Sequence, residues 1–415
     1  MFRREKRFIW IISIGVLILL LGTNLLTFFL VNIIKIENDE KIVISTEEYN
    51  NFLELKQKYR KSEVLQRYIK ENYLGEIDEK KLMEGTYKGM FSILEDPYSL
   101  YMSEDEFKDY NEHTSGIYIG IGVIITPGDD NLITVVSPIE GTPAERAGLK
   151  TNDKIIKVND QDFTAEEMND AINVIKGEEG TDVKITILRR DKYGKQKEID
   201  LTITREKIKQ ISVRSQVIDN NIGYIRIISF DKQTADDFKV QLKELENQKI
   251  KGLIIDLRNN PGGLLEQCAQ ITDTLMGEGT IVYTETKDKQ RQYLKSDKDK
   301  IDIPVVVLRN GGSASASEIL AGALKDTNSG TLVGTRTFGK GIVQTIKPYP
   351  QDGSGFKLTI SEYFTPNGLN IHGIGIEPHF YVELPDDIER IGVENLENDT
   401  QLKKAVEIIN DKNNQ

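Results

Sequence analysis

Cysteine and histidine are scarce in this chain of 415 residues, which holds one cysteine and three histidines. The single cysteine, Cys268, cannot form an internal disulfide, and its apolar helical setting predicts a small core residue rather than a reactive thiol. The histidines, His113, His372 and His379, fit no H-E-x-x-H or C-x-x-C spacing, so nothing supports a zinc site. We therefore expect a chemistry that needs neither a metal nor a cofactor.

Basic residues are also in the minority. The 54 lysines and arginines are outnumbered by 66 aspartates and glutamates, which gives a formal net charge of −12. No basic stripe beyond the N-terminus could neutralise a phosphate backbone, and this excludes nucleic acid as an expected partner. The length predicts two or three domains, each with its own core.

Charged residues are missing from one long stretch, Phe8 to Ile34. This stretch is long enough to cross the hydrocarbon core of a bilayer as a helix. Four basic residues precede it and residues 35–41 are mixed in charge, so the positive-inside rule places the N-terminus in the cytoplasm and the body outside. A cleaved signal peptide is the alternative, but the run is too long and no small-x-small site ends it. We expect residues 1–36 to form a cytoplasmic tip and an uncleaved anchor at the cell membrane.

The two regions that flank the body carry helical patterns. Residues 37–115 are charged and periodic, which predicts amphipathic helices that pack on the body or on a second copy. In the C-terminal tail, residues 386–415, one face of a predicted helix carries Leu402, Ala405, Val406 and Ile409. That stripe is too narrow to be a core by itself. We expect the tail to pack on the body or on a partner chain and to help form a homodimer.

Residues 116–206 have the pattern of a small β-rich module. Val183 to Leu188 and Ile199 to Ile203 alternate as strands do, and a helix is expected from Thr164 to Lys176. The module resembles a PDZ domain through Gly141 to Leu149 and Asp153 to Asn159, which are similar to the central PDZ signature.

The start of this module is similar to the carboxylate-binding loop of PDZ domains. That loop corresponds to Gly120, Ile121, Gly122 and Val123. Glycines let backbone N–H groups converge on a terminal carboxylate, and a bound peptide can then add as a strand. The resemblance implies a groove for protein C-termini, with Met168 and Ile172 facing it.

Residues 207–385 alternate between strand and helix patterns, which predicts an α/β layer with sites at the strand ends. One such end is Arg258 to Gly263, where two glycines precede a helix and can offer N–H groups to an anion. Another is Asn310 to Ser317, which joins an apolar strand, Ile303 to Leu308, to a helix. A turn of this kind lifts a hydroxyl out of the sheet edge beside free N–H groups, as an acyl-transfer enzyme requires.

The serine of that turn also has a purely structural interpretation. Ser315-Ala316-Ser317-Glu318 fits the S-x-x-E capping box, and most serines that precede helices are only caps. Downstream, Lys340 stands between two glycines in an apolar context that could desolvate its ammonium group and lower its pKa. A lysine so tuned can act as the general base for a serine, although most glycine-flanked lysines are exposed turn residues.

Four blocks together resemble the carboxyl-terminal processing, or tail-specific, peptidases. They are Asp256 to Gly263, Gly312 to Asp326, Thr337 to Gln344, and Tyr363 to Pro378; a fifth similar block, Glu95 to Met102, lies upstream. The resemblance implies an α/β, crotonase-like serine peptidase domain with the PDZ-like module inserted before it. It further implies Ser315 as nucleophile, Lys340 as base and Gln344 as the residue that orients the lysine. An oxyanion hole from the N–H groups of Ala316 and of Gly262 or Gly263 is also implied, and we choose Gly262.

The sequence departs from the family pattern at one place, where Leu369 and His372 replace the usual arginine and glutamine. We interpret His372 as a packing or specificity residue, because no aspartate motif accompanies it to complete a Ser-His-Asp triad.

Two functions from different classes remain. The first is an extracytoplasmic serine endopeptidase that captures protein C-termini and cleaves near them. The second is an anchored adaptor that only presents the PDZ groove. The serine, lysine and glutamine together favour the enzyme, since an adaptor has no use for them.

Overall fold

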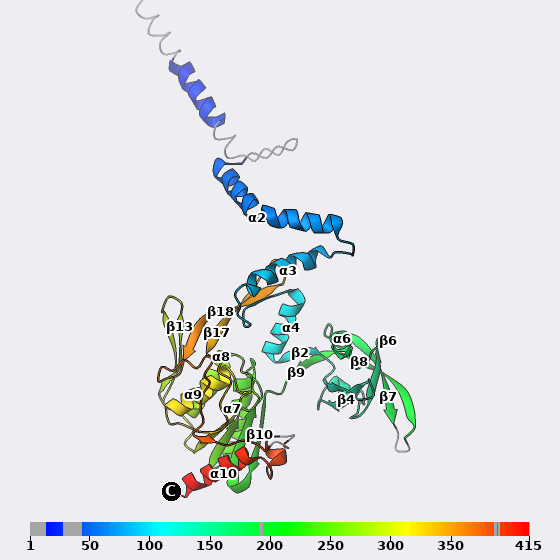
Figure 1. Ribbon diagram of the computed structural model, residues 1–415, viewed down its shortest axis with the longest axis vertical. Helices are drawn as coiled ribbons and strands as arrows, with labels where there is room; N and C mark the ends of the chain where they lie inside the picture. The colour runs from blue at the N-terminus through cyan, green and yellow to red at the C-terminus, as the bar shows by residue number, and fades with distance from the viewer. Residues whose placement is uncertain (1–13, 28–43, 191–193, 386–387, 389–390, 415) are drawn as a thin grey trace, which may run out of the picture. The chain divides into compact units, whose positions relative to one another are not determined.

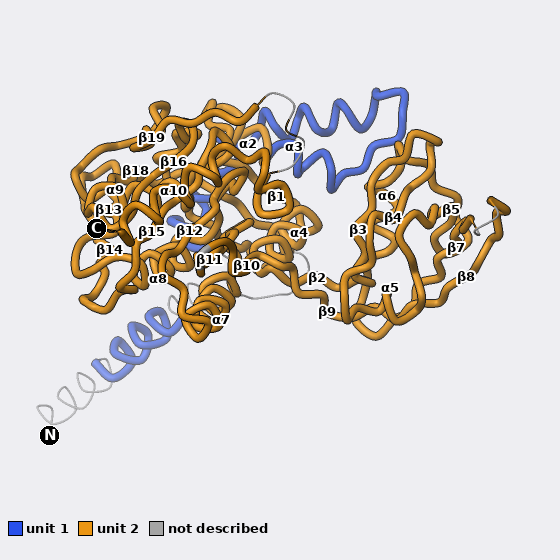
Figure 2. The backbone as a smooth tube through the Cα atoms, turned by 90° about the horizontal axis from the view of Figure 1, so that it is seen from below, with its two compact units in different colours: residues 1–86 blue, residues 87–415 orange. Residues whose placement is uncertain are grey.

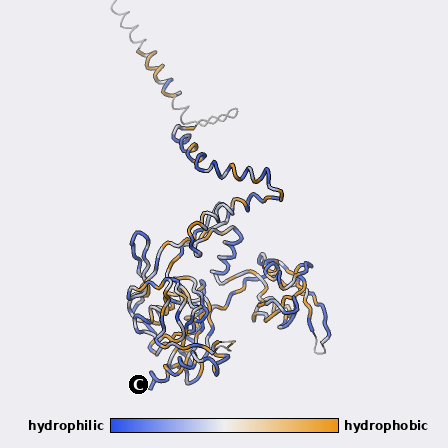
Figure 3. Tube along the Cα trace, in the orientation of Figure 1, coloured by the Kyte–Doolittle hydropathy of each residue, from blue (hydrophilic) through white to orange (hydrophobic). Residues whose placement is uncertain are grey.

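The computed structural model describes residues 14–27, 44–190, 194–385, 388 and 391–414 (Figure 1). The chain divides into two compact units, residues 1–86 and residues 87–415 (Figure 2). The described part of the first unit is helical: residues 14–27, α2 (Thr46–Asn72), and the beginning of α3 (Glu79–Ser92). Ser45 and Glu48 form a reciprocal capping box that starts α2, and α2 buries no residue. Its sequence is mostly hydrophilic with apolar residues interspersed (Figure 3).

The expected membrane span, residues 8–34, is described only over residues 14–27, which are helical. The remainder of the span lies outside the described residues. Within the part of the chain that the structure describes, no helix has the length and apolarity needed to cross a membrane.

The second unit contains the β-rich module as a six-stranded antiparallel sheet with its own core. The strands, in sheet order, are β3 (Val123–Pro127), β4 (Ile133–Pro138), β5 (Lys154–Val158), β7 (Asp182–Arg190) and β8 (Gln196–Thr204), and β6 (Gln161–Asp162) pairs with β5. The module is entered and left through a ribbon in which β2 (Ile117–Gly120) pairs with β9 (Glu206–Lys209).

Two short helices cover this sheet, α5 (Pro143–Arg146) and α6 (Met168–Ile175). The expected helix start at Thr164 was wrong, since α6 begins four residues later. Thr164 does donate its N–H to the Glu167 carboxylate at 3.0 Å, as a capping box would. The next residue, Ala165, donates its N–H to the Asn131 carbonyl at 2.9 Å, which ties the segment before α6 to the loop before β4.

A six-stranded sheet forms the centre of the remaining chain, and all its neighbouring strands are parallel except the first pair. In order they are β10 (Val213–Ile218), β11 (Ile222–Ile227), β12 (Gly252–Asp256), β15 (Val305–Arg309), β16 (Thr331–Gly334) and β19 (Phe380–Tyr381). The central strands are runs of Val, Ile and Leu because both faces of a parallel sheet are covered by helices. The predicted α/β layer is thus present.

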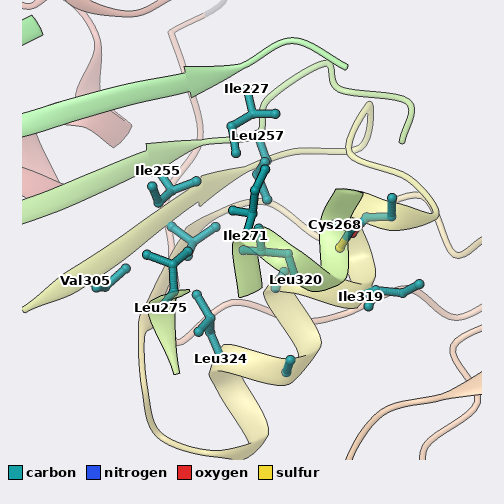
Figure 4. Packing of buried hydrophobic residues seen from close by; sticks show 14 of the residues in the cluster. Ile227, Ile255, Leu257, Cys268, Ile271, Leu275, Val305, Ile319, Leu320 and Leu324 are labelled. Atoms are coloured by element: carbon teal, nitrogen blue, oxygen red, sulfur yellow. The ribbon is translucent and has the colours of Figure 1, made fainter. Parts of the chain in front are cut away.

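One face of this sheet is covered by α7 (Thr234–Asn247), α8 (Leu265–Leu275) and α9 (Ala316–Asp326). Figure 4 shows α8 and α9 packed side by side against the strands, with Cys268 between them. Cys268 is fully buried and its Sγ lies 3.0 Å from the Ala316 carbonyl oxygen. Burial raises the pKa of this thiol to about 12, so the expectation of a core cysteine is confirmed.

The opposite face is covered by the tail helix α10 (Thr400–Asn413). Leu402, Ala405 and Ile409 are fully buried there against residues of the strands such as Ile254 and Val306. Of the two alternatives for the tail, packing on the body is therefore the observed one.

A second, smaller sheet completes the domain. Its order is β1-β18-β13-β14, and β17 pairs with β18. The strands are β1 (Leu100–Met102), β13 (Gly279–Thr286), β14 (Arg291–Ser296), β17 (Ile342–Pro348) and β18 (Gly355–Phe364), and α4 (Glu104–Ser115) follows β1. This sheet positions the residues that face the turn after β15.

Candidate active site

Ser315 stands at the junction of β15 and α9, where the chain makes a tight turn. Its backbone has φ of 54° and ψ of −114°, a conformation that residues with a Cβ rarely adopt. The turn is fixed to the neighbouring strand end, because Ser313 Oγ donates to the Leu257 carbonyl at 2.8 Å and the Ala314 N–H donates to the Asn260 carbonyl at 3.0 Å. Strain that the surroundings hold in place is typical of functional turns.

The capping interpretation of Ser315 is correct for its backbone. The Ser315 N–H donates to the Glu318 carboxylate at 2.9 Å, and α9 begins at the next residue. A cap does not require the strained turn, however, so capping explains only part of the arrangement.

A cavity of 490 Å³ opens beside Ser315. Residues far apart in the sequence line it, and all five that we predicted for the catalytic site or its oxyanion hole are among them: Ser315, Ala316, Lys340, Gln344 and Gly262. The alternative glycine, Gly263, also lines it. A cavity of this size that combines apolar walls with a few polar groups is typical of a binding site.

Lys340 is partly buried in this cavity, and its Nζ lies 4.4 Å from the centre of the Tyr98 ring. Burial lowers the pKa of Lys340 below its ordinary value, and the nearby charge of Lys357 lowers it further, whereas Asp96 and Glu318 oppose the shift. The flanking glycines are required by space: a Cβ on Gly341 would lie 2.6 Å from the backbone nitrogen of His372. The shift has the direction that a general base needs.

Gln344 lies beside a bulge in the β17–β18 ladder and donates from Nε2 to Thr359 Oγ1 at 3.1 Å. The backbone N–H of Thr359 in turn donates to Ser99 Oγ at 2.9 Å, and Ser99 donates to the Asp96 carboxylate at 2.5 Å. A chain of hydrogen bonds thus connects Gln344 to the segment before β1.

The two glycines of the turn after β12 differ in one respect. The N–H of Gly262 donates to Asn260 Oδ1 at 2.8 Å and is therefore occupied. Among the described residues, no acceptor pairs with the N–H of Gly263 or of Ala316. Of the two glycines, Gly263 therefore has the available N–H group, and this favours it over Gly262 as the oxyanion donor.

A second cavity, of 460 Å³, lies along the start of the β-rich module. Five of the six predicted groove residues line it: Gly120, Ile121, Gly122, Val123 and Ile172. Met168 does not, because it packs against the core of the module instead. No described acceptor pairs with the N–H groups of Ile121 and Gly122, which leaves them available for an anion.

Three family profiles match consecutive parts of the chain. The N-terminal domain profile of the activating protease CtpB matches residues 19–106, a PDZ profile matches residues 134–189, and the profile of peptidase family S41 matches residues 221–382.

Curated relatives agree with these profiles. The chain is 42% identical over 320 residues to the carboxy-terminal processing protease CtpA of Bacillus subtilis. The matched region covers 77% of this chain and 67% of that protein. It is 40% identical over 338 residues to a carboxy-terminal-processing protease of Bartonella bacilliformis, with 80% and 76% covered. The chain belongs to peptidase family S41. The expected serine peptidase and its PDZ domain are thereby confirmed, and the adaptor alternative is not supported.

The fold is shared with a solved structure assigned to the S41 proteases of Bacteroides fragilis. The TM-score is 0.52 at 18% identity, and the match covers 83% of this chain and 96% of that one. At this level of identity the comparison concerns the fold alone.

Several residues of this S41 cavity were not predicted from the sequence. They are His113 on α4, Lys357 on β18, Tyr363 on β18 and Glu266 on α8. Tyr98 and Asp96 belong to the Glu95 to Met102 block, which resembles the family but carries no obvious chemistry. Lys357 has no motif of its own, so only the pairing of β17 with β18 reveals that it faces the same cavity as Lys340.

His372, the departure from the S41 pattern, does not line the cavity. Its side chain is exposed, and its backbone N–H donates to Asn370 Oδ1 at 2.8 Å. The backbone of His372 packs directly against Gly341, the residue after Lys340. His372 therefore supports the loop that carries Lys340 through its main chain. A Ser-His-Asp triad has no geometric support in this arrangement.

Proposed function

We propose that this chain is a membrane-anchored, extracytoplasmic serine endopeptidase that binds protein C-termini in its PDZ groove and cleaves near them. Ser315 is the nucleophile, Lys340 the general base and Gln344 a residue that orients the base. One observation carries this proposal: a single cavity brings together a hydroxyl on a strained turn, a lysine with a lowered pKa and two available N–H groups. Cleavage of an unfolded reporter by Ser315→Ala and Lys340→Arg is the measurement that tests it.

The reaction begins with Lys340 in its neutral form. Ser315 Oγ attacks the carbonyl carbon of the scissile peptide while Lys340 Nζ takes the hydroxyl proton. The N–H groups of Ala316 and Gly263 donate to the oxyanion of the tetrahedral intermediate. The C–N bond then breaks, and the Lys340 ammonium returns the proton to the leaving amine.

The acyl-enzyme is hydrolysed by the same groups in reverse roles. Lys340 takes a proton from water, the resulting hydroxide attacks the ester carbonyl, and the proton returns to Ser315 Oγ as the product acid leaves. Gln344 lines the same cavity as Lys340, and its bond to Thr359 fixes its side chain there, which supports its proposed role in orienting the lysine.

Recognition of C-termini is proposed for the groove at Gly120 to Val123, because the loop offers unused N–H groups and an apolar wall that includes Ile172. Gly122 has φ of 77°, and a Cβ there would lie 2.4 Å from Thr142 Cβ, so a side chain at this position would disrupt the loop itself. Ile172 is the better position for a test.

In a Ser315→Ala background, which binds without cleaving, Ile172→Asp should weaken a peptide with a free apolar C-terminus by about tenfold or more. The substitution removes an apolar contact and adds a negative charge beside the carboxylate. Asn173→Asp, on the exposed neighbouring position of α6, is the matched control. Fluorescence anisotropy measures both, and amidation of the peptide should weaken binding to the unmodified groove. Equal binding of free and amidated peptides would contradict the carboxylate interpretation.

Anchoring, an extracytoplasmic body and a homodimer form the remaining part of the proposal. The apolar run at Phe8 to Ile34 and the basic residues before it support the first two. Apolar side chains that α2 leaves exposed, such as Phe52 and Leu65, support an interface with a second copy.

A membrane-impermeant amine crosslinker added to intact spheroplasts should label lysines of the body and produce a species of twice the chain mass. Labelling should be confined to lysines beyond residue 34, and Lys6 should stay unmodified because it is proposed to lie on the cytoplasmic side. Mass spectrometry of the recovered protein identifies the sites. An unlabelled body would contradict the topology, and a labelled body without the doubled species would contradict the homodimer.

A further inference from the structure

One acidic side chain behind the catalytic cavity has no role in the reaction described above. Glu318 lies in the first turn of α9 and is fully buried, with 0% of its surface exposed. A buried carboxylate is costly unless hydrogen bonds replace its hydration. The partners of Glu318 therefore show what this position does.

Two of its bonds reach the backbones of the proposed nucleophile and base. Glu318 Oε2 accepts the N–H of Ser315 at 2.9 Å and the N–H of Lys340 at 2.8 Å. These two residues come from different loops, the turn after β15 and the loop after β16. A backbone bond from the Phe338 N–H to the Ser313 carbonyl, at 3.1 Å, also joins these loops, but the Glu318 oxygen holds the N–H groups of Ser315 and Lys340 themselves.

The other oxygen fixes the carboxylate itself. Glu318 Oε1 accepts the N–H of Gly339 at 2.7 Å and the hydroxyl of Thr337 at 2.6 Å. Thr337 Oγ1 also accepts the N–H of Ile376 at 2.7 Å, so its hydroxyl proton is directed at the glutamate. Four donors on two oxygens leave the side chain one orientation.

Ordinary capping does not account for this arrangement. Glu48 and Glu106 occupy the equivalent position in the capping boxes of α2 and α4, and both are exposed carboxylates that accept the N–H of their own cap residue. Glu318 makes the same bond and three more, all to the loop after β16 that carries Lys340.

We propose that Glu318 is a positioning residue that holds the nucleophile Ser315 and the base Lys340 in one rigid frame. The inference rests on the roles proposed for these two residues above. Because one oxygen accepts both N–H groups, a shift of either loop stretches the bond to the other. Reacting groups must stay within a fraction of an ångström of their working geometry, and this carboxylate supplies the constraint from behind the cavity.

The charge of Glu318 also acts on Lys340. Glu318 and Asp96 raise the pKa of Lys340, against the larger effect of burial and the charge of Lys357, which lower it. The other ionisable side chains on the cavity wall are His113, Asp231, Glu266 and the phenols of Tyr110 and Tyr363, and Tyr98 lies against the ammonium group. Removing the negative charge of Glu318 should therefore lower the pKa of Lys340 further.

The test is the pH profile of reporter cleavage by full-length Glu318→Gln. The carboxamide keeps the volume but places an NH₂ group where backbone donors point. We expect the plateau kcat to fall by about a hundredfold, with KM nearly unchanged, because misplacement of the reacting groups has effects of this size. On the acid side of the pH profile, kcat/KM rises as Lys340 loses its proton. This rise should move to lower pH in Glu318→Gln. Glu48→Gln is the matched control, since it changes a capping glutamate far from the cavity and should leave both readouts unchanged.

A merely structural role for Glu318 would reduce the amount of folded enzyme without moving the acid limb of the pH profile. Folded Glu318→Gln with the kcat and the acid limb of the unmodified enzyme would overturn the proposal. Activity in Ser315→Ala would instead overturn the proposed function on which the proposal rests. If Glu318→Gln does not fold, Thr337→Val replaces it. This substitution removes the hydroxyl that fixes the orientation of the carboxylate, while Oε1 keeps only the N–H of Gly339 and can turn away from its working position. We then expect kcat to fall by about tenfold at constant KM, and an unchanged kcat would overturn the proposal.

Discussion

Lys340→Arg is expected to be as inactive as Ser315→Ala, with kcat/KM reduced on the order of a thousandfold or more, by analogy with the loss of triad members in other serine peptidases. Arginine keeps the positive charge and roughly the length of lysine but stays protonated at any working pH. It can stabilise an oxyanion, yet it cannot accept the proton of Ser315. The substitution therefore separates a general base from a purely electrostatic lysine.

The pH dependence of the unmodified enzyme makes the same point independently. Lys340 must be neutral before attack, so kcat/KM should rise with pH through an apparent pKa below the ordinary value of about 10.4 for lysine. Burial, aided by the charge of Lys357, produces this shift. A limb at or above the ordinary lysine pKa would contradict the role of Lys340 as base.

The measurement is cleavage of an unfolded reporter by protein whose fold is checked by thermal melting. Lys347→Arg is the matched control, because Lys347 lies on β17, close to Lys340 in the sequence, but is exposed and does not line the cavity. It should retain full activity. Substantial cleavage by folded Lys340→Arg would require a different base.

The second large effect is on stability, and it concerns the tail. Asp399→Ala should lower the free energy of unfolding of the peptidase domain by about 3–5 kcal/mol, the usual result of removing one partner of a buried ion pair. Arg258 is fully buried and lies 2.8 Å from Asp399 Oδ2 and 2.6 Å from Asp256 Oδ2. Without Asp399, the guanidinium would lose its ion pair with the tail while it remains out of reach of water.

This ion pair also has a predictable pH dependence. Burial by itself would raise the pKa of Asp399, but the hydrogen bond and charge of Arg258 outweigh it, and the pKa lies below the ordinary value. A carboxyl whose pKa is lowered by folding stabilises the native state above its unfolded pKa, near 3.9, and that contribution disappears as the pH falls through the folded value. The difference between Asp399→Ala and the unmodified protein should accordingly shrink only in strong acid.

Urea denaturation followed by circular dichroism measures the difference, with Asp411→Ala as control because Asp411 is exposed near the end of the same helix. The control should change stability by no more than about 0.5 kcal/mol. Equal stability of the two variants would show that the tail contributes nothing through Arg258.

Local patterns were enough to identify the elements and their order. The apolar run before Asn310 and the helical spacing after Ser315 correspond to β15 and α9, and Gly252 to Leu257 contains β12. These assignments succeed because side chains near each other in the sequence decide whether a segment is a helix or a strand. The PDZ domain was recognisable for the same reason, since its glycines and its alternating strands are local features.

The sequence also determined which residue types form the site, but the tertiary structure alone decided how they are joined. The N–H of Gly263 is available where that of Gly262 is not, because the Asn260 side chain accepts the Gly262 N–H. Met168 does not line the groove, because it packs against the core of the module. Glu318 is an ordinary capping residue in the sequence and becomes the link between two loops only when the loop after β16 folds over α9. Contacts of this kind depend on packing between residues that are distant in the chain, and no local periodicity encodes them.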